Sequence, residues 1–266
     1  METWTDPTGF VYPACPESVQ QKYMRVLEHL ARLQMLRDSF SNDDAPDLTH
    51  RVEADGLEHV YLAADDLPEV PPEVNILIGE CLFHLRSMLD YLALQLVPTA
   101  DRTSHERSSQ FPISKSPHDW KSDKSRVKGA PAAAVAVIEG MQPYQPSPNG
   151  KVPLWWLNTL SNIDKHRVPV VASAAVSVIY VNDPAERLKT NPGAWDFARE
   201  PVRVVGDEFA RLTLSTPASD LNIGVRIGYE LAFFEDGVKK APVVDTLSQI
   251  AFVVRYLVVN DLQQWL

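Results

Sequence analysis

The sequence predicts an α+β protein in which a helical bundle packs with an antiparallel β-sheet and a C-terminal helix. Apolar residues recur at steps of three and four as far as about Arg167, which is typical of helices. Beyond that point β-branched residues alternate with polar ones, which favours strands. The last stretch of the chain is again helical in its pattern. Since the strands have no other cover, we expect the helices and the sheet to share one core.

Residues 1–266 are therefore predicted to form a single domain. The helical part is expected to cover about residues 14–167, and the sheet with the C-terminal helix about residues 168–266. A chain of 266 residues is long enough to bury a large core. Its apolar fraction of 45% and charged fraction of 23% are ordinary for a globular protein, so long disordered segments are not expected.

Three long helices are expected in the first part of the chain. The first spans Pro16–Ser39, where apolar residues keep a helical period. The second spans Pro71–Val97, begins at two prolines and ends before Pro98. It has an apolar stripe at heptad spacing, formed by Ile78, Leu82, Leu85, Leu89, Leu92 and Leu96. The third begins near Pro153 and ends at about Arg167.

Strands are expected in two parts of the chain. Before the second helix, residues 49–54 and 58–63 are strand-like, and Asp55-Gly56 between them favours a hairpin turn. After Arg167, strands are predicted within 168–181, 201–206, 209–216 and 223–235. The chain then closes with a helix, whose inward-facing residues are predicted to be Leu247, Ile250, Val254, Leu257 and Val258.

The region between the second and third helices reads as a long connection. Residues 99–130 are polar apart from one hydrophobic island, "QFPIS" at 110–114, and are expected to form a long surface connection with one short helix over about 118–125. Residues 131–142 predict another short helix. Residues 142–150 are rich in proline and predict an extended linker.

The composition argues against several classes of protein. A formal charge of -10 and a pI near 5.2 repel polyanions, so nucleic acid is not expected as a partner. The N-terminus lacks a basic segment followed by an apolar one, and no membrane-spanning stretch is expected. Cys15 and Cys81 lie far apart and in no metal or redox spacing. These features predict a cytoplasmic protein without membrane contact.

No cofactor and no metal are predicted. The sequence contains no glycine-rich phosphate loop after a strand, no Gly-x-Ser-x-Gly and no His-Glu-x-x-His. Glu80 with His84, and Asp164 with His166, offer a carboxylate–histidine set of a kind that can hold a metal. The paired Glu-x-x-His motif of di-iron bundles is missing, however, which argues against that use.

The densest group of charged residues is "LSNIDKHRVP", residues 160–169, at the end of the third helix. Lys165 and Arg167 suit a last helical turn, where cations complement the exposed carbonyl groups. Asp164 lies near the negative end of the same helix dipole, where a carboxylate is unfavourable. We therefore expect Asp164 to have a cationic partner, either Arg86 or Arg167.

The second helix supplies further candidates in "ECLFHLRSMLDYLA". Arg86 and Asp90 are four residues apart, so they share a helix face beside the leucine stripe. If the second and third helices pack together, these two can meet Asp164 and either His166 or Arg167. Three interpretations of such a group are open: a buried ion-pair network that fixes the helix register, a functional cleft, or simple exposure on the surface. A common solvent-accessible pocket for Arg86, Asp164 and His166 would favour the cleft.

Four segments together resemble a family of uncharacterised bacterial proteins that is frequent in actinobacteria. They read "LRSMLDYLA", "FPI", "QPY" and "LNTLSNIDKHR" and fall between Ile78 and Arg167. The family's helix is similar to the Arg-x4-His motif of HEPN-type helical domains. Those domains commonly act as metal-independent ribonucleases or nucleotide-linked defence modules, and they assemble the motif at a dimer interface.

The resemblance places Arg86 at the arginine of that motif and Tyr91 where the histidine belongs. A phenol is a poor general acid or base near neutral pH. The resemblance therefore implies one of three outcomes: the chain is not a HEPN-type nuclease, it is a non-catalytic relative, or His166 replaces the histidine from another helix.

Three functional hypotheses follow. The leading one is a soluble cytoplasmic binding or regulatory protein with a HEPN-like helical core and no assigned catalysis. The candidate ligand-binding residues are Asp90, Tyr91 and Arg167. The second hypothesis is a ribonuclease or phosphoester hydrolase whose catalytic residues are Arg86, which holds phosphate, His166, which transfers protons, and Asp164. The third is a structural protein that forms a homodimer through its leucine-striped helices.

Overall fold

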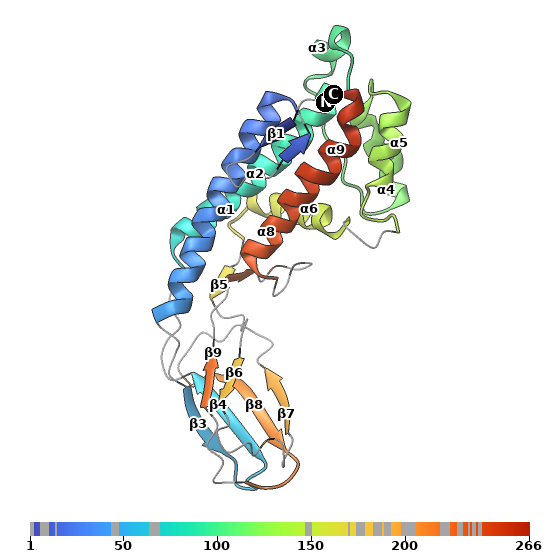
Figure 1. Ribbon diagram of the computed structural model, residues 1–266. Helices are drawn as coiled ribbons and strands as arrows, with labels where there is room; N and C mark the ends of the chain where they lie inside the picture. The colour runs from blue at the N-terminus through green and yellow to red at the C-terminus, as the bar shows by residue number, and fades with distance from the viewer. Residues whose placement is uncertain are drawn as a thin grey trace. The chain divides into compact units, whose positions relative to one another are not determined.

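The computed structural model confirms the α+β class (Figure 1). It contains long helices, a four-stranded antiparallel sheet and a C-terminal helix. The residues that the structure describes are 3–5, 11–13, 15–43, 48–63, 70–146, 151–169, 171–173, 179–182, 188, 193–197, 206–218, 224–227, 231–233, 235, 238 and 241–266.

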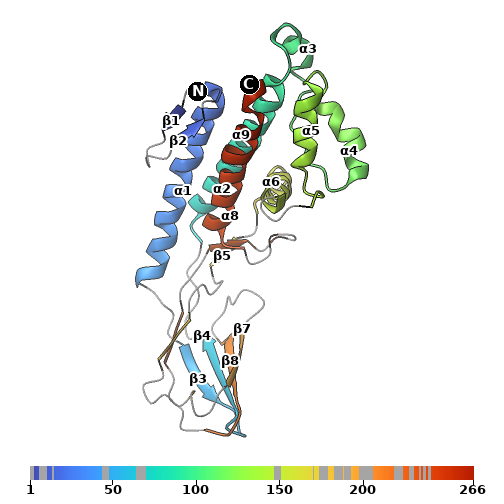
Figure 2. The same ribbon diagram turned by 45° about the vertical axis from the view of Figure 1, so that its right-hand side comes forward.

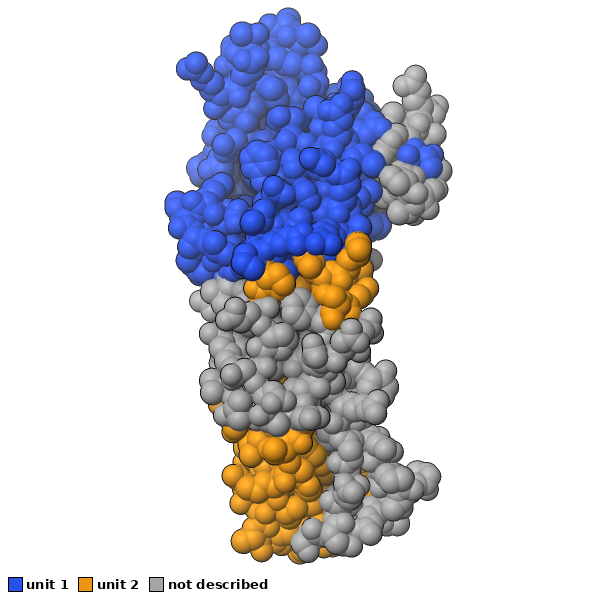
Figure 3. All heavy atoms as spheres, turned by 90° about the vertical axis from the view of Figure 1, so that its left-hand side faces the viewer, with its two compact units in different colours: residues 1–33, 72–169, 235–266 blue, residues 34–71, 170–234 orange. Residues whose placement is uncertain are grey.

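The chain divides into two compact units, which Figure 3 colours separately. The helical unit comprises residues 1–33, 72–169 and 235–266, and the sheet unit comprises residues 34–71 and 170–234. This division differs from the expected boundary near residue 167, because the early hairpin belongs with the sheet and the C-terminal helix belongs with the helices. Whether both units form the single expected domain stays a prediction.

The three long helices of the first part are confirmed. They are α1 (Glu17–Asp43), α2 (Pro72–Gln95) and α6 (Lys151–Asp164). The C-terminal α8 (Val243–Phe252) packs against α2 and α6, which also contact each other (Figure 1 and Figure 2). The helix then continues through a π-helical turn, η3 (Val253–Val258), and not as the regular α-helix expected.

The leucine stripe of α2 forms part of the core of the helical unit. All six predicted stripe residues, Ile78, Leu82, Leu85, Leu89, Leu92 and Leu96, are buried. An interface between two copies of the chain would therefore need other side chains of α2. The large apolar residues that α2 exposes are Ile76, Phe83 and Tyr91. The expected homodimer stays a prediction.

The C-terminal stretch Val243–Trp265 differs from the expectation about membranes. It is long and apolar enough to cross a membrane by length and composition alone, and 67% of its apolar window is buried inside the protein. A helix that is apolar all round is found in protein cores as well as in membranes. Of the five inward-facing residues predicted here, Leu247, Ile250 and Val254 are buried, and the side chains of Leu257 and Val258 lie outside the described residues.

The connection between α2 and α6 contains several short helices. These are η1 (Thr99–Asp101), α3 (Arg102–His105), α4 (Pro117–Asp123), η2 (Lys124–Val127) and α5 (Ala132–Gly140). The predicted helices near 118–125 and 131–142 are thus confirmed, while η1 and α3 were not predicted. The surface prediction is wrong for residues 111–114, which are buried.

The linker prediction for residues 142–150 is wrong at its start, because Gln142 is fully buried. Residues 147–150 lie outside the described part of the chain. Near the N-terminus, β1 (Thr3–Thr5) pairs with β2 (Val11–Pro13), a small antiparallel ladder that was not predicted.

The sheet unit is built on the predicted hairpin. Its four-stranded sheet has the order β3 (Leu48–Val52), β4 (Glu58–Ala63), β8 (Glu208–Leu214) and β7 (Gly193–Phe197), all antiparallel. Gly56 has a φ of 66° in the hairpin turn, a left-handed conformation that favours glycine. The Asp55 carboxylate accepts a hydrogen bond of 2.9 Å from the Leu57 N–H and closes the turn.

The remaining strands form two separate antiparallel pairs. In one pair, β5 (Val171–Ser173) lies beside β10 (Leu231–Phe233), and in the other, β6 (Ile179–Asn182) lies beside β9 (Gly224–Ile227). The strand predicted over 201–206 lies largely outside the described residues, and β7 was not predicted.

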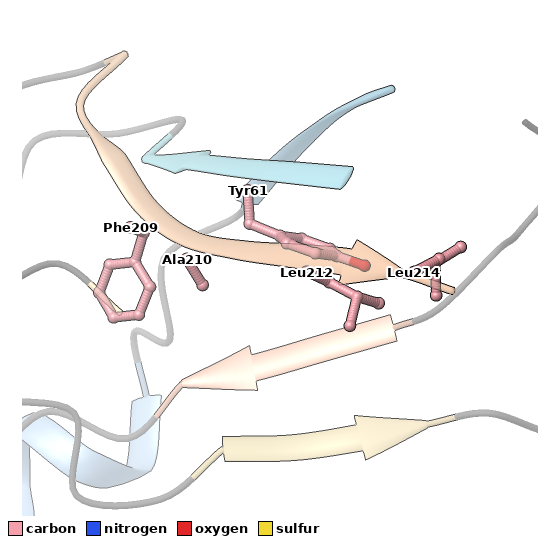
Figure 4. Close-up of a cluster of buried hydrophobic side chains, with 5 residues drawn as sticks. All are labelled: Tyr61, Phe209, Ala210, Leu212 and Leu214. Carbon is pink, nitrogen blue, oxygen red and sulfur yellow. The ribbon is translucent and has the colours of Figure 1, made fainter. Parts of the chain in front are cut away.

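The core of the sheet unit follows from the alternation along β8. Ala210, Leu212 and Leu214 are buried, and Tyr61 of β4 lies opposite Ala210 in the ladder (Figure 4). Arg211 points to the other face, where its guanidinium bonds to Glu58 and Glu208. Buried apolar side chains therefore hold one face of the sheet and ion pairs cover part of the other.

Two histidines pair across the hairpin of this unit. The Nε2 atom of His50 lies 2.9 Å from the Nδ1 atom of His59, a hydrogen-bonding distance between the rings. His59 is fully buried, and burial lowers its pKa, although an interaction with the backbone of Ala218 partly offsets the effect. Burial and the positive charge of His59 lower the pKa of His50 as well.

We expect the unfolding free energy to fall on acidification below about pH 6.5, the ordinary histidine pKa. A lowered pKa in the folded state means that the unfolded chain binds more protons there, so stability is lost as the pH falls towards the folded-state pKa values. Urea unfolding above and below this pH measures the change. His59→Gln should weaken the pH dependence, whereas His166→Gln, at an exposed ring, should leave it as in the wild type. An equal dependence in all three proteins would contradict the assignment.

Candidate functional site

The helical unit contains a cleft of about 460 Å³ between α2 and α6. The segment around Gln110 and the turn from α4 into η2 complete its wall. The lining residues are Leu82, Phe83, Arg86, Ser87, Asp90, Gln110, Ile113, Asp123, Arg126, Asn158, Ser161, Asn162, Asp164 and Lys165. Most of these side chains are polar or charged, so the cleft is suited to a polar molecule and not to an apolar one.

Arg86 and Asp90 bind the backbone of Phe111 at one side of the cleft. The Arg86 Nη2 atom donates to the Phe111 carbonyl at 2.7 Å and to the Asp90 carboxylate at 2.9 Å. The same Asp90 oxygen accepts the Phe111 N–H at 2.9 Å. Because the two residues are four apart on α2, they act together on one residue of the neighbouring segment. The ion pair therefore bonds to both the N–H and the carbonyl group of Phe111, as a neighbouring β-strand would do in a sheet.

Gln142 binds the next residues of the same segment. Its amide oxygen accepts the Ser114 N–H at 2.7 Å, and its amide nitrogen donates to the carbonyl groups of Pro112 at 3.0 Å and Ile138 at 2.9 Å. Gln142 is fully buried, so these bonds replace water for its amide group and for the three backbone groups that it binds. Three side chains from two distant parts of the chain, Arg86, Asp90 and Gln142, thus fix the segment from Phe111 to Ser114.

This arrangement brings the four segments of the family resemblance together. "LRSMLDYLA" supplies the Arg86–Asp90 pair, "FPI" is the segment that it binds, and "QPY" supplies Gln142. The fourth segment, at the end of α6, supplies Asp164 to the same cleft. The sequence indicated each segment, but it did not indicate that the first three are joined through backbone hydrogen bonds.

Asp164 lies against α2 but without the partner that was expected. Arg86 is paired with Asp90, and Arg167 is paired with Glu235, so both parts of the expectation are wrong. Within the described ranges no hydrogen bond or ion pair joins Asp164 to another side chain. Burial raises the pKa of its carboxyl group.

Gly79 makes room for that carboxylate. A Cβ atom at residue 79 would lie 3.0 Å and 3.3 Å from the two Asp164 carboxylate oxygens. Such distances are too short for an ordinary contact, so the absence of a side chain at Gly79 allows α6 to place Asp164 there. The carboxylate is therefore positioned by packing and not by a counter-charge.

The other predicted site residues lie away from the cleft. Arg167 forms a bidentate ion pair with the buried Glu235, and both N–O distances are 2.7 Å. His166 is exposed, and Tyr91 is exposed with its ring 5.2 Å from the Lys22 ammonium. None of these three lines the cleft. The structure therefore brings together Arg86, Asp90 and Asp164 but not the proposed proton-transfer residue.

Several lining residues were not predicted from the sequence. Asn158 and Asn162 are four apart on α6 and share a face, which is the signal that could have indicated them. Asp123 and Arg126 come from the supposed surface connection, where the Asp123 carboxylate accepts a hydrogen bond of 2.8 Å from the Ser114 hydroxyl. Their place in the cleft depends on the burial of the segment before them.

No metal site is found among the residues that the structure describes. No group of three His, Cys, Asp or Glu side chains is placed there to hold an ion. Glu80 lies 3.2 Å from His29 Nε2, in an interaction that the sequence did not suggest. Burial raises the pKa of the Cys81 thiol to about 12, so its metal-binding thiolate form is disfavoured.

Comparisons with known proteins assign neither a family nor a function to the chain. No protein-family model, curated protein or solved structure matches the chain. The resemblance to the actinobacterial family and to HEPN-type domains stays a prediction.

Proposed function

We propose that the protein binds a small polar molecule in the cleft between α2 and α6. The supporting observation is the cleft itself, whose volume of about 460 Å³ falls within the ordinary range for ligand sites, about 300 to 1,000 Å³. Carboxamide groups of Asn158, Asn162 and Gln110 line it and can both donate and accept hydrogen bonds. A cytoplasmic binding or regulatory role fits this proposal.

The chemistry of the lining favours binding over catalysis. The Ser161 hydroxyl donates to the Leu157 carbonyl at 2.6 Å, so it is engaged with its own helix, and no described side chain is hydrogen-bonded to it as an activating base. Arg86 is occupied by Asp90 and the Phe111 carbonyl. A general acid or base must reach the reacting atoms, and His166 is not in the cleft wall.

A screen of small polar metabolites by thermal shift tests the proposal. A bound ligand stabilises the folded protein, by about 2.7 kcal/mol at a hundredfold excess over its dissociation constant. Compounds that raise the melting temperature of the wild type should fail with Asn162→Trp, which fills the cleft. His166→Trp is the matched control, because both residues are exposed and only Asn162 lines the cleft. The proposal fails if no compound acts, or if the two variants respond alike.

The ribonuclease alternative has a direct test of its own. Incubating mixed RNA with the wild type and with His166→Ala should give no cleavage by either protein if the cleft is a binding site. Cleavage by the wild type that His166→Ala abolishes would restore the catalytic hypothesis with Arg86 and His166. The negative charge of -10 also opposes RNA binding.

A further inference from the structure

Only some of the charged side chains in the cleft wall form ion pairs among the described residues. Arg86 is paired with Asp90 at 2.9 Å, and Arg126 with Asp123 at 3.4 Å. These two pairs neutralise four of the charged side chains that line the cleft. The others are Asp164 and its neighbour Lys165.

The remaining carboxylate and the remaining ammonium differ in their surroundings. Asp164 is the last residue of α6 and lies against Gly79, whose missing side chain leaves space for the carboxylate oxygens. It stands at the negative end of the helix dipole, which disfavours its charge further. Lys165 lies beyond the helix end on an exposed, flexible stem, and an ammonium is strongly hydrated there. A partly buried carboxylate that has no counter-charge among the described residues is a better determinant of ligand charge than a hydrated lysine.

The described wall of the cleft therefore presents one carboxylate without a counter-charge, Asp164, among neutral hydrogen-bonding groups. A cation placed against Asp164 would supply the missing counter-charge and offset the unfavourable dipole. Ser87, Asn158 and Asn162 can hydrogen-bond to hydroxyl groups on the remainder of such a molecule.

We propose that the ligand of this cleft is a small hydroxylated amine whose ammonium group pairs with the Asp164 carboxylate. This inference rests on the proposed binding function and adds the charge and chemical class of the ligand. The ammonium donates to the carboxylate oxygens, and the hydroxyl groups bind the carboxamide-lined wall.

Three linear polyols of equal chain length test the charge preference. Glucamine ends in an ammonium, sorbitol in a hydroxyl group and gluconate in a carboxylate. Their affinities are measured by titration of the amide signals of α2 and α6 in NMR spectra. Glucamine is expected to bind about tenfold more tightly than sorbitol, and gluconate least tightly, because a charge-assisted hydrogen bond replaces a neutral one.

Two variants connect the preference to Asp164. Asp164→Asn should remove the advantage of glucamine without lowering the melting temperature, because the carboxylate has no partner among the described residues and burial already opposes its charge. Lys165→Met is the matched control at the adjacent lining residue and should keep the preference.

The possible failures are distinguishable. If sorbitol or gluconate binds as tightly as glucamine, or if Lys165→Met and not Asp164→Asn changes the order, the ammonium assignment is overturned while the binding function stands. If none of the three polyols binds, the assignment to hydroxylated amines is overturned, and the metabolite screen decides the binding function separately.

Discussion

Arg86→Met is expected to lower the unfolding free energy by about 2 to 3 kcal/mol. The methionine keeps most of the side-chain volume but removes the guanidinium that donates to Asp90 and to the Phe111 carbonyl. Phe111 is fully buried, so its carbonyl group loses a partner that water replaces poorly. The side chains of Arg86 and Asp90 are 15% and 30% exposed, which keeps the loss below that of a fully buried pair.

Arg126→Met is the matched control for this prediction. Arg126 also lines the cleft and pairs with a carboxylate, but the distance is 3.4 Å and its side chain is 47% exposed. Exposed pairs of this kind contribute less than about 1 kcal/mol. Urea unfolding of the two variants and the wild type measures the difference. If both substitutions change the unfolding free energy equally, the Arg86–Asp90 pair does not hold the Phe111 backbone as inferred.

The helices and the first hairpin were predictable because their signals are local. The six apolar residues of the α2 stripe repeat with the helix period, and Pro72 marks the start of the helix. Asp55-Gly56 predicts a tight turn because Gly56 adopts a positive φ there. In each case the residues that determine the structure lie within one turn of the element that they shape.

The burial of residues 111–114 was not predictable from the same signals. The segment is a recognisable apolar island, but it is short, is flanked by polar residues and contains a proline, so it reads as part of a surface loop. Its burial depends on Arg86 and Gln142, which lie 25 and 28 or more positions away in the chain. Side-chain patterns do not reveal which distant backbone group a side chain will bind.

The error about Asp164 has the same origin. Pairing charges by type suggested Arg86 as its partner, but a backbone carbonyl and Asp90 occupy that guanidinium. Arg167 was the other choice, and it binds Glu235, which lies 68 positions further along the chain. The sequence correctly singled out Asp164 as the residue that the helix end does not explain. Only the structure shows that it faces a cleft beside Gly79, with no cationic partner among the described residues.

Gln142→Leu is expected to have the largest effect on stability, a loss of about 3 to 4 kcal/mol. Leucine has a similar volume, so little cavity is created, but three hydrogen bonds disappear. The Ser114 N–H and the Pro112 carbonyl then remain in a buried environment without their partner, and each unsatisfied group costs about 1 to 3 kcal/mol. Such a loss is a large share of a typical folding free energy of about 5 to 15 kcal/mol.

Gln110→Leu is the matched control for the loss of the Gln142 hydrogen bonds, because it makes the same change of residue type at an exposed position. Gln110 directly precedes the same segment but is exposed, so the substitution should change the unfolding free energy by no more than about 0.5 kcal/mol. Because Gln142 does not line the cleft, Gln142→Leu should also weaken ligand binding only through the position of the segment that it holds. Equal stability of the two variants in urea would mean that the Gln142 hydrogen bonds do not fix the cleft wall. A large loss for Gln142→Leu alone would mean that the "FPI" and "QPY" segments form one structural unit, on which the shape of the α2–α6 cleft depends.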